Sequence, residues 1–404
     1  MGGDRSGSTD RFSAIESPLR FLLQDVSPVR FLTEYWGRKP LHVPGNGRDF
    51  NTLLALPWRQ VRSLSTHVRA GRRGADGRFH QISARPADLR RRAPRSGVTI
   101  CSDHADRWLT AFSDRLRVEL GLTGRTSFVQ CYESSHKSGL GGHFDNSHVF
   151  VLQVEGEKRW LVSKKPLVPY PESDAVVDNG SVIVHHRTVR APKRSACADV
   201  IMRPGDFLYL PPGAWHRPIA RGHSMALSLS PVNVSMGQFV TRLIEQRLDP
   251  DWQWRQLLPP LYDPTARGAF PAARLQLRQF ISQLRACVAE LDEDTLLRAW
   301  LSALPLPSTS GRSRRRARWT PTTRLQHVWP GALRLLADDD AVTLFHGSFA
   351  ARMNIAGLPL ARWVATHASF TLGEAAGAVR PALDLRDVQA LAHLLVEGGV
   401  VRVL

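Results

Sequence analysis

The sequence predicts an α+β protein whose core is an antiparallel double-sheet barrel, or jelly roll, with helices on either side of it. Short segments rich in β-branched and aromatic residues follow one another from Thr126 to Ser230 and are bounded by Gly, Pro, Asp and Asn. No helical pattern interrupts them, which is typical of strands that pair antiparallel in two facing sheets. Before and after this region the apolar residues take up helical spacing instead.

The segments before the barrel differ in character. Residues 15–45 show helical spacing as far as "GRKPLHVPG", where Pro40 and Pro44 end the helix and an extended segment begins. Residues 68–97 are rich in Arg and Gly with little periodicity, so we expect a surface loop there. Residues 107–121 predict an amphipathic helix that ends at Gly121. Inside the barrel region, "VEGEKRW" predicts a hairpin around Gly156.

Helical patterns return after the barrel and divide the rest of the chain. "QFVTRLIEQRL" and "LRQFISQLRACVAEL" predict amphipathic helices within residues 233–302, a candidate dimerisation segment. Residues 303–319 are rich in Pro, Ser and Arg, as linkers are. Residues 320–404 predict a mostly helical unit that closes with a helix, a Gly-Gly turn and a strand, as a winged-helix-like domain would. We therefore expect a disordered tail over 1–14 and a barrel domain over 15–232.

Composition limits the location of the protein more than its function. No run of about 18 apolar residues predicts a membrane span, and the N-terminus lacks the apolar stretch of a secretory signal. Four scattered cysteines fit a reducing cytoplasm. The net charge of +18 has two interpretations: an acidic partner such as nucleic acid or the ribosome, or a GC-rich genome, since the chain strongly prefers Arg to Lys.

Two separated motifs carry the chemistry. In "GGHFDNSHVFVLQVEGEKRW", His143 and Asp145 lie two residues apart, so a strand would project them from the same face, whereas His148 would face the other way. An H-x-D alone is more often an ordinary strand end. Downstream, "RPGDFLYLPPGAWHRP" delivers His216 through a tight Pro-Pro-Gly turn. Two imidazoles and a carboxylate form the facial triad that holds Fe(II) with positions left open for co-substrate and oxygen.

Such an iron site needs a reductant for oxygen, and 2-oxoglutarate is the common one. Its distal carboxylate requires a fixed cation deep in the barrel. Lys158 stands on the strand after Gly156, and it is a lysine in a chain that otherwise prefers arginine. The alternative interpretation is a solvated lysine beside a turn.

Three segments together resemble a known family. "YWGRKPLHV", "HFDNSHVFVLQVEGEKRW" and "PGDFLYLPPGAWH" are similar to the JmjC-type 2-oxoglutarate oxygenases of the cupin-4, or ribosomal oxygenase, group. The resemblance implies a double-stranded β-helix of JmjC/cupin type, with N-terminal helices before it and a dimerisation segment and winged helix after it. It implies Fe(II) held by His143, Asp145 and His216, and 2-oxoglutarate held by Lys158, Tyr132, Gln130 and Ser228. The chain departs from the family in a loop between Tyr132 and His143 that is one residue shorter, and in His148, where relatives often carry an acid near the substrate opening.

The function expected from this combination is oxygen-dependent hydroxylation of a peptide or protein side chain. The resemblance implies the β-carbon of Arg or His, in a ribosomal protein or in the precursor peptide of a ribosomally made natural product. It also implies a homodimer and, for a ribosomal substrate, association with the ribosome. Two alternatives stay open: lysine demethylation, and a winged-helix nucleic-acid-binding protein with a non-catalytic barrel, which the "GRSRRRAR" stretch favours.

Overall fold

The computed structural model describes most of the chain as two compact units, Met1–Val232 and Asn233–Leu404, and each is considered by itself. The described residues are 15, 17–53, 60, 67–73, 79–82, 85–91, 97–103, 109–124, 127–178, 180–184, 186–259, 261, 270–306 and 319–404. The predicted tail over 1–14 and most of the predicted linker lie outside them. No helix within these ranges is long and apolar enough to cross a membrane.

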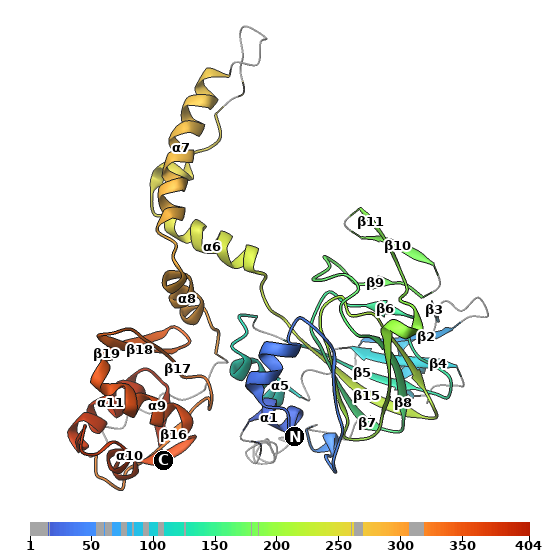
Figure 1. Cartoon of the computed structure of the whole chain (residues 1–404), viewed down its shortest axis with the longest axis horizontal. Coiled ribbons are helices and arrows are strands. Elements are labelled where there is room, and N and C mark those ends of the chain that lie inside the picture. The colour runs from blue at the N-terminus through green and yellow to red at the C-terminus, as the bar shows by residue number, and fades with distance from the viewer. Residues whose placement is uncertain are drawn as a thin grey trace. The chain divides into compact units, whose positions relative to one another are not determined.

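The first unit is built on two facing antiparallel sheets (Figure 1). The larger sheet has the order β1 (Leu41–Val43), β13 (Phe207–Leu210), β7 (Val149–Glu155), β15 (Ser224–Pro231), β5 (Ser127–Ser134), β4 (Val98–Asp103), β2 (His67–Arg73) and β3 (Phe79–Gln81). The smaller has the order β12 (Cys197–Met202), β8 (Lys158–Ser163), β14 (His216–Ala220), β6 (His143–Phe144) and β9 (Ala175–Val176). A separate hairpin joins β10 (Ser181–Val184) to β11 (Arg187–Arg190). The predicted α+β class and jelly-roll core are confirmed.

The hairpin predicted around Gly156 is wrong. Gly156 does form a turn with a positive φ of 67°, but the two strands that it joins belong to different sheets. β7 pairs with β13 and β15, whereas β8 pairs with β12 and β14. The turn therefore carries the chain from one layer to the other, because each strand finds its partners later in the sequence.

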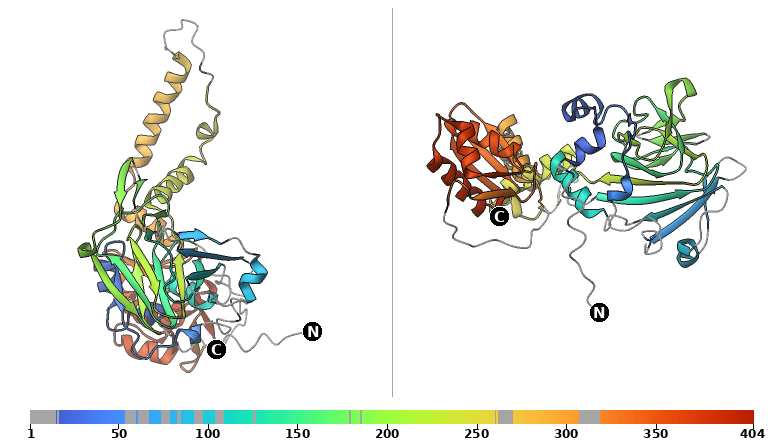
Figure 2. Two further views of the ribbon diagram at one scale, coloured as in Figure 1. Left: turned by 90° about the vertical axis from the view of Figure 1, so that its right-hand side faces the viewer. Right: turned by 90° about the horizontal axis from the view of Figure 1, so that it is seen from below.

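The surface loop predicted over residues 68–97 is also wrong. Strands β2 and β3 and helix α4 (Pro86–Arg91) occupy much of this stretch and extend the larger sheet to an edge coloured blue and cyan in Figure 2. Along β2, Val68 and Ala70 are buried with Ile100, while Arg69 between them is exposed. This alternation over residues 67–70 is the period of a half-buried strand, and the arginines of this stretch obscured it.

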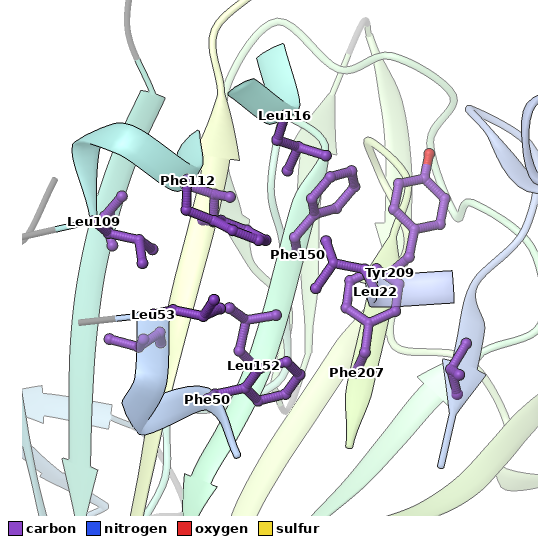
Figure 3. Packing of buried hydrophobic residues seen from close by; sticks show 14 of the residues in the cluster. Leu22, Phe50, Leu53, Leu109, Phe112, Leu116, Phe150, Leu152, Phe207 and Tyr209 are labelled. Atoms are coloured by element: carbon purple, nitrogen blue, oxygen red, sulfur yellow. The ribbon is translucent and has the colours of Figure 1, made fainter. Parts of the chain in front are cut away.

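The outer face of the larger sheet is covered by helices. These are α1 (Pro18–Leu23), α2 (Pro28–Arg30), the π-helix η1 (Phe31–Tyr35), the 3-10 turn η2 (Phe50–Leu53) and α5 (Thr110–Leu120). The helix predicted over 107–121 is confirmed, and Gly121 ends it in the left-handed conformation with a φ of 64°. Figure 3 shows this core: Leu22, Phe50 and Phe112 from the covering segments pack on Phe150, Leu152 and Phe207 of the sheet.

Side chains alternate along these strands, so the residues between those of the outer core point into the space between the two sheets. On β5 and β15 this inner set includes Tyr132, Ala226 and Ser228, which face away from the outer core residues Cys131 and Leu227. On β8 and β14 it includes Lys158 and His216. The candidate site residues therefore share the interior between the two sheets.

The second unit begins with three helices, α6 (Met236–Leu248), α7 (Pro271–Ala289) and α8 (Glu293–Ser302), which confirms the helices predicted over 233–302 (Figures 1 and 2). The remainder contains α9 (Leu358–Thr366), α10 (Leu372–Val379) and α11 (Leu385–Glu397). It also contains two three-stranded sheets, β20 (Ser369–Thr371), β16 (Arg324–His327) and β21 (Val401–Val403), and β17 (Arg334–Ala337), β18 (Ala341–His346) and β19 (Phe349–Asn354). The closing helix, Gly-Gly turn and strand are confirmed, but the unit holds more strand than predicted.

Candidate metal centre

Strand pairing brings the two predicted histidines together. His216 begins β14 and is the direct partner of His143 on β6, with ring centroids 4.2 Å apart. Asp145 follows β6, and its carbonyl accepts a hydrogen bond of 2.8 Å from the Gly213 amide in the Pro-Pro-Gly turn. The Asp145 carboxylate lies 3.9 Å from Nε2 of His143 and 3.6 Å from Nε2 of His216. All three candidate ligand atoms lie within 4.8 Å of one another.

Backbone carbonyls fix the orientation of both imidazole rings. Nδ1 of His143 lies 2.7 Å from the Gly141 carbonyl, and Nδ1 of His216 lies 2.9 Å from the Ala214 carbonyl. A carbonyl only accepts, so each Nδ1 carries the proton and each Nε2 is left with its lone pair facing Asp145. This arrangement, in which the second ring nitrogen donates to a fixed acceptor, is the one that metal-ligating histidines use.

Buried polar contacts hold the strand that carries His143. The Asp178 carboxylate accepts from the Gly142 amide at 3.0 Å, and the Trp215 indole donates to the Val177 carbonyl at 2.9 Å. A Cβ at Gly142 would lie 2.3 Å from the Trp215 ring, so only glycine allows this approach. Sequence analysis did not single out Asp178, because nothing near it in the chain indicates its partner.

The charge states also suit a metal. Burial lowers the pKa of His216 well below its usual value, and neighbouring His143 lowers it further. Burial raises the pKa of Asp145, while His143 opposes that rise. Neutral imidazoles can bind a cation directly, and a divalent ion would restore the charged form of Asp145.

Lys158 occupies the interior farther along the same strands. It pairs with Ala220 on β14, four residues beyond the pairing of Val162 with His216, and its side chain is 3% exposed. Among the described residues its ammonium has no hydrogen-bond acceptor and no carboxylate partner. Burial lowers its pKa from 10.5 to about 8. A buried cation without a partner is costly, and it fits a site that an anionic ligand completes.

A second unpaired donor lies between Lys158 and the histidines. Trp160 stands two residues after Lys158 on β8, on the same face, and its ring lies 5.7 Å from that of His216. Its indole N–H is buried and has no acceptor in the described part of the chain. Sequence analysis missed Trp160, although its spacing from Lys158 predicts a shared strand face. Lys158 and Trp160 thus offer two buried donors, and these fit a ligand that brings carboxylate oxygens into the barrel.

The other residues that the resemblance implies also line the interior. Tyr132 and Gln130 lie on β5, opposite Ala226 and Ser228 of β15. The Tyr132 hydroxyl donates to Oε1 of Gln130 at 2.8 Å, so the Gln130 amide is engaged with protein. Ser228 is half-buried and has no recorded polar partner among the described residues.

His148 lies outside the interior. Its ring stacks on Trp36 with centroids 3.9 Å apart, and its Nδ1 lies 2.8 Å from the Tyr209 hydroxyl. That hydroxyl also accepts from the Gly37 amide at 2.8 Å. Burial lowers the pKa of His148 to about 3, so the ring is neutral. The structure therefore places His148 in packing between the N-terminal segment and the sheet, and not among the candidate ligands, as strand parity predicted.

Comparison with known proteins gives a family for the barrel region. Residues 111–238 match the family model described as the JmjC domain. Among curated proteins, an uncharacterized protein, YxbC of Bacillus subtilis, is 24% identical over 60% of this chain and 79% of its own length. Ribosomal oxygenase 2 of Mus musculus is 27% identical over 53% of this chain, which spans about half (48%) of that relative. A bifunctional lysine-specific demethylase and histidyl-hydroxylase of Drosophila willistoni is 34% identical over 24% of this chain and 12% of its own length.

Among solved structures, YcfD of Escherichia coli covers 94% of this chain and 98% of its own, with 18% identity and a TM-score of 0.49. The barrel and the domain match define a JmjC-type oxygenase. Residues 111–238 belong to the JmjC domain family and are similar to ribosomal oxygenases, and the chain is a 2-oxoglutarate-dependent oxygenase by class. Fe(II) and 2-oxoglutarate are the cofactors of that class.

Proposed function

We propose that the protein uses Fe(II) and 2-oxoglutarate to hydroxylate a side chain of a peptide or protein. The observation that carries this proposal is that two features lie together in the interior of the barrel. One is a set of three ligand atoms from His143, Asp145 and His216 within 4.8 Å. The other is the buried ammonium of Lys158 on the adjoining strand, which has no partner within the described part of the chain. One feature suits a divalent metal, and the other suits the far carboxylate of a short dicarboxylate.

Each residue has a definable task in this proposal. His143 and His216 present Nε2 because the Gly141 and Ala214 carbonyls hold their Nδ1 protons. Asp145 supplies the charged ligand between them. A metal held by these three protein ligands would keep positions open for co-substrate and oxygen. The bound metal and 2-oxoglutarate supply the oxidising chemistry, and the apolar walls of the barrel exclude water.

Lys158 fixes the orientation of the dicarboxylate. Its backbone position is set by pairing with both β12 and β14, which limits the reach of the ammonium. Trp160 offers a second buried donor on the same face. We assign Tyr132 and Ser228 to the wall of this pocket. Gln130 supports Tyr132, because its Oε1 accepts a hydrogen bond from the Tyr132 hydroxyl.

The names of the relatives support a protein substrate. Two kinds of relative bear the names ribosomal oxygenase and histidyl-hydroxylase. We propose the β-carbon of an Arg or His residue as the target, in a ribosomal protein or in a precursor peptide. We also propose that α7 forms the interface of a homodimer, because it exposes Leu277, Ile281 and Leu284.

A peptide library tests the activity. Purified protein is incubated with Fe(II), 2-oxoglutarate, ascorbate and peptides that each contain one Arg or one His in varied surroundings, and with intact ribosomes. The expected result is succinate formation together with the gain of one oxygen in a peptide or ribosomal protein. His143→Ala removes a ligand and is expected to abolish both signals.

The same experiment separates the alternatives. Loss of a methyl group from methyl-lysine peptides, with no oxygen retained, would support demethylation instead. Equal, background-level succinate from the wild-type protein and His143→Ala, with tight binding of duplex DNA or RNA, would support a nucleic-acid-binding protein with a non-catalytic barrel.

A further inference from the structure

A chain of polar contacts runs from the outer strands of the larger sheet to the interior wall. Arg69 on β2 makes a bidentate contact with Asp103 on β4, with N–O distances of 2.8 and 2.9 Å. Asp103 accepts from the Gln130 amide nitrogen at 2.7 Å. Gln130 accepts from the Tyr132 hydroxyl at 2.8 Å. Four side chains on three strands are thus connected by successive short hydrogen bonds.

Every hydrogen bond in this chain has a fixed direction. Asp103 is ionised: burial would raise its pKa, but the hydrogen bonds from Arg69 and Gln130 hold it below its usual value. An ionised carboxylate only accepts, so the Gln130 amide must turn its nitrogen toward Asp103 and its oxygen toward Tyr132. The Tyr132 hydroxyl is therefore held by a group whose own orientation depends on the Arg69–Asp103 pair.

Tyr132 is the end of the chain that faces the metal centre. Its side chain lies on the inner face of β5, opposite Ala226 of β15. Burial raises its pKa, and the charges of Cys101 and Asp145 add to that rise, which places the hydroxyl within electrostatic range of the Asp145 carboxylate. A shift of its ring would change the wall of the pocket in which Lys158 and Trp160 offer unpaired donors.

We propose that Arg69 and Asp103 are positioning residues that, through Gln130, hold Tyr132 in the place where it forms the wall of the 2-oxoglutarate pocket. This inference rests on the proposed function and names residues outside the barrel strands that carry the ligands. Arg69 is 57% exposed in its side chain, so an isolated pair at this position would contribute little to stability. The pair matters because a connected network transmits a constraint that an exposed ion pair alone does not.

The test measures 2-oxoglutarate binding by calorimetry without oxygen, with Mn(II) in place of Fe(II). Arg69→Ala and Asp103→Asn are expected to weaken 2-oxoglutarate binding by about fivefold, the effect of one lost buried hydrogen bond. Mn(II) affinity is expected to stay unchanged. Arg72→Ala is the matched control, because Arg72 is an exposed arginine on the same strand, and it is expected to leave binding unchanged. Arg69→Lys keeps the charge without the bidentate fork and is expected to weaken binding less than Arg69→Ala.

A double-mutant cycle separates positioning from general stability. If Arg69 acts through Tyr132, the Arg69→Ala change has no further effect once Tyr132→Phe has removed the hydroxyl. Equal effects of Arg69→Ala in both backgrounds, or an effect equal to that of Arg72→Ala, would overturn the inference while leaving the proposed function intact. Absence of any 2-oxoglutarate binding by the wild-type protein with Mn(II) would overturn both.

Discussion

Replacing Lys158 by methionine should stabilise the ligand-free protein and weaken its binding of 2-oxoglutarate. Lys158 is 3% exposed, and its ammonium has no partner among the described residues. Burial lowers its pKa from 10.5 to about 8. One pKa unit corresponds to about 1.4 kcal/mol, so holding the charge in the fold at neutral pH costs roughly 3 kcal/mol. Methionine fills a similar volume without that cost.

The same change removes the cation that the dicarboxylate needs. Hydrogen bonds to charged groups contribute about 1.5–3 kcal/mol, so Lys158→Met should weaken 2-oxoglutarate binding roughly 10- to 100-fold. Urea denaturation measures the first effect, and calorimetry with Mn(II) measures the second. Lys165→Met is the control, because Lys165 is exposed shortly after the same strand, and it should change neither quantity. A Lys158→Met variant that is less stable than wild type and binds 2-oxoglutarate normally would refute the reasoning.

The remaining predictions concern pH and assembly. Affinity for 2-oxoglutarate should be full below pH 8 and fall as pH rises through about 8, where Lys158 loses its proton; Lys158→Arg, which stays charged, should abolish that fall in calorimetric titrations. Burial lowers the pKa of His346 from 6.5 to about 4, so the unfolded chain binds the proton first, and stability measured in urea should drop by up to about 3 kcal/mol between pH 6.5 and 4; His346→Leu should flatten this dependence. Light scattering should show a dimer that Leu277→Asp with Ile281→Asp converts to a monomer, whereas a wild-type monomer would contradict the proposed interface.

Strand periodicity and motif spacing singled out the three residues that the structure brings together. His143 and Asp145 could be placed on one face from their spacing, and the Pro-Pro-Gly turn before His216 predicted a second imidazole nearby. The exact pairing of His216 with His143 needs the register between β14 and β6, which the sequence does not contain. The parity that set His148 aside is a local property, but its stacking on Trp36 is a tertiary contact that no local pattern indicates.

The errors have a common physical origin. The hairpin around Gly156 was inferred from two adjacent strands, although each strand pairs with segments far along the chain. Strand β2 was overlooked because its arginines, among them the exposed Arg69, weaken the apolar signal. The Arg69–Asp103 pair joins residues 34 positions apart and depends on that overlooked strand. Pairings between distant segments set all three features, and composition alone does not reveal them.

The central claim is that the His143, Asp145 and His216 site directs oxygen from O2 into a peptide. The most direct measurement uses ¹⁸O₂ with Fe(II), 2-oxoglutarate and the peptide library, and compares the labelled product with the succinate formed. We expect one ¹⁸O in each hydroxylated peptide and one succinate for each product, and neither from His143→Ala. Succinate formation by wild type no greater than by His143→Ala, or product oxygen derived from water, would contradict it.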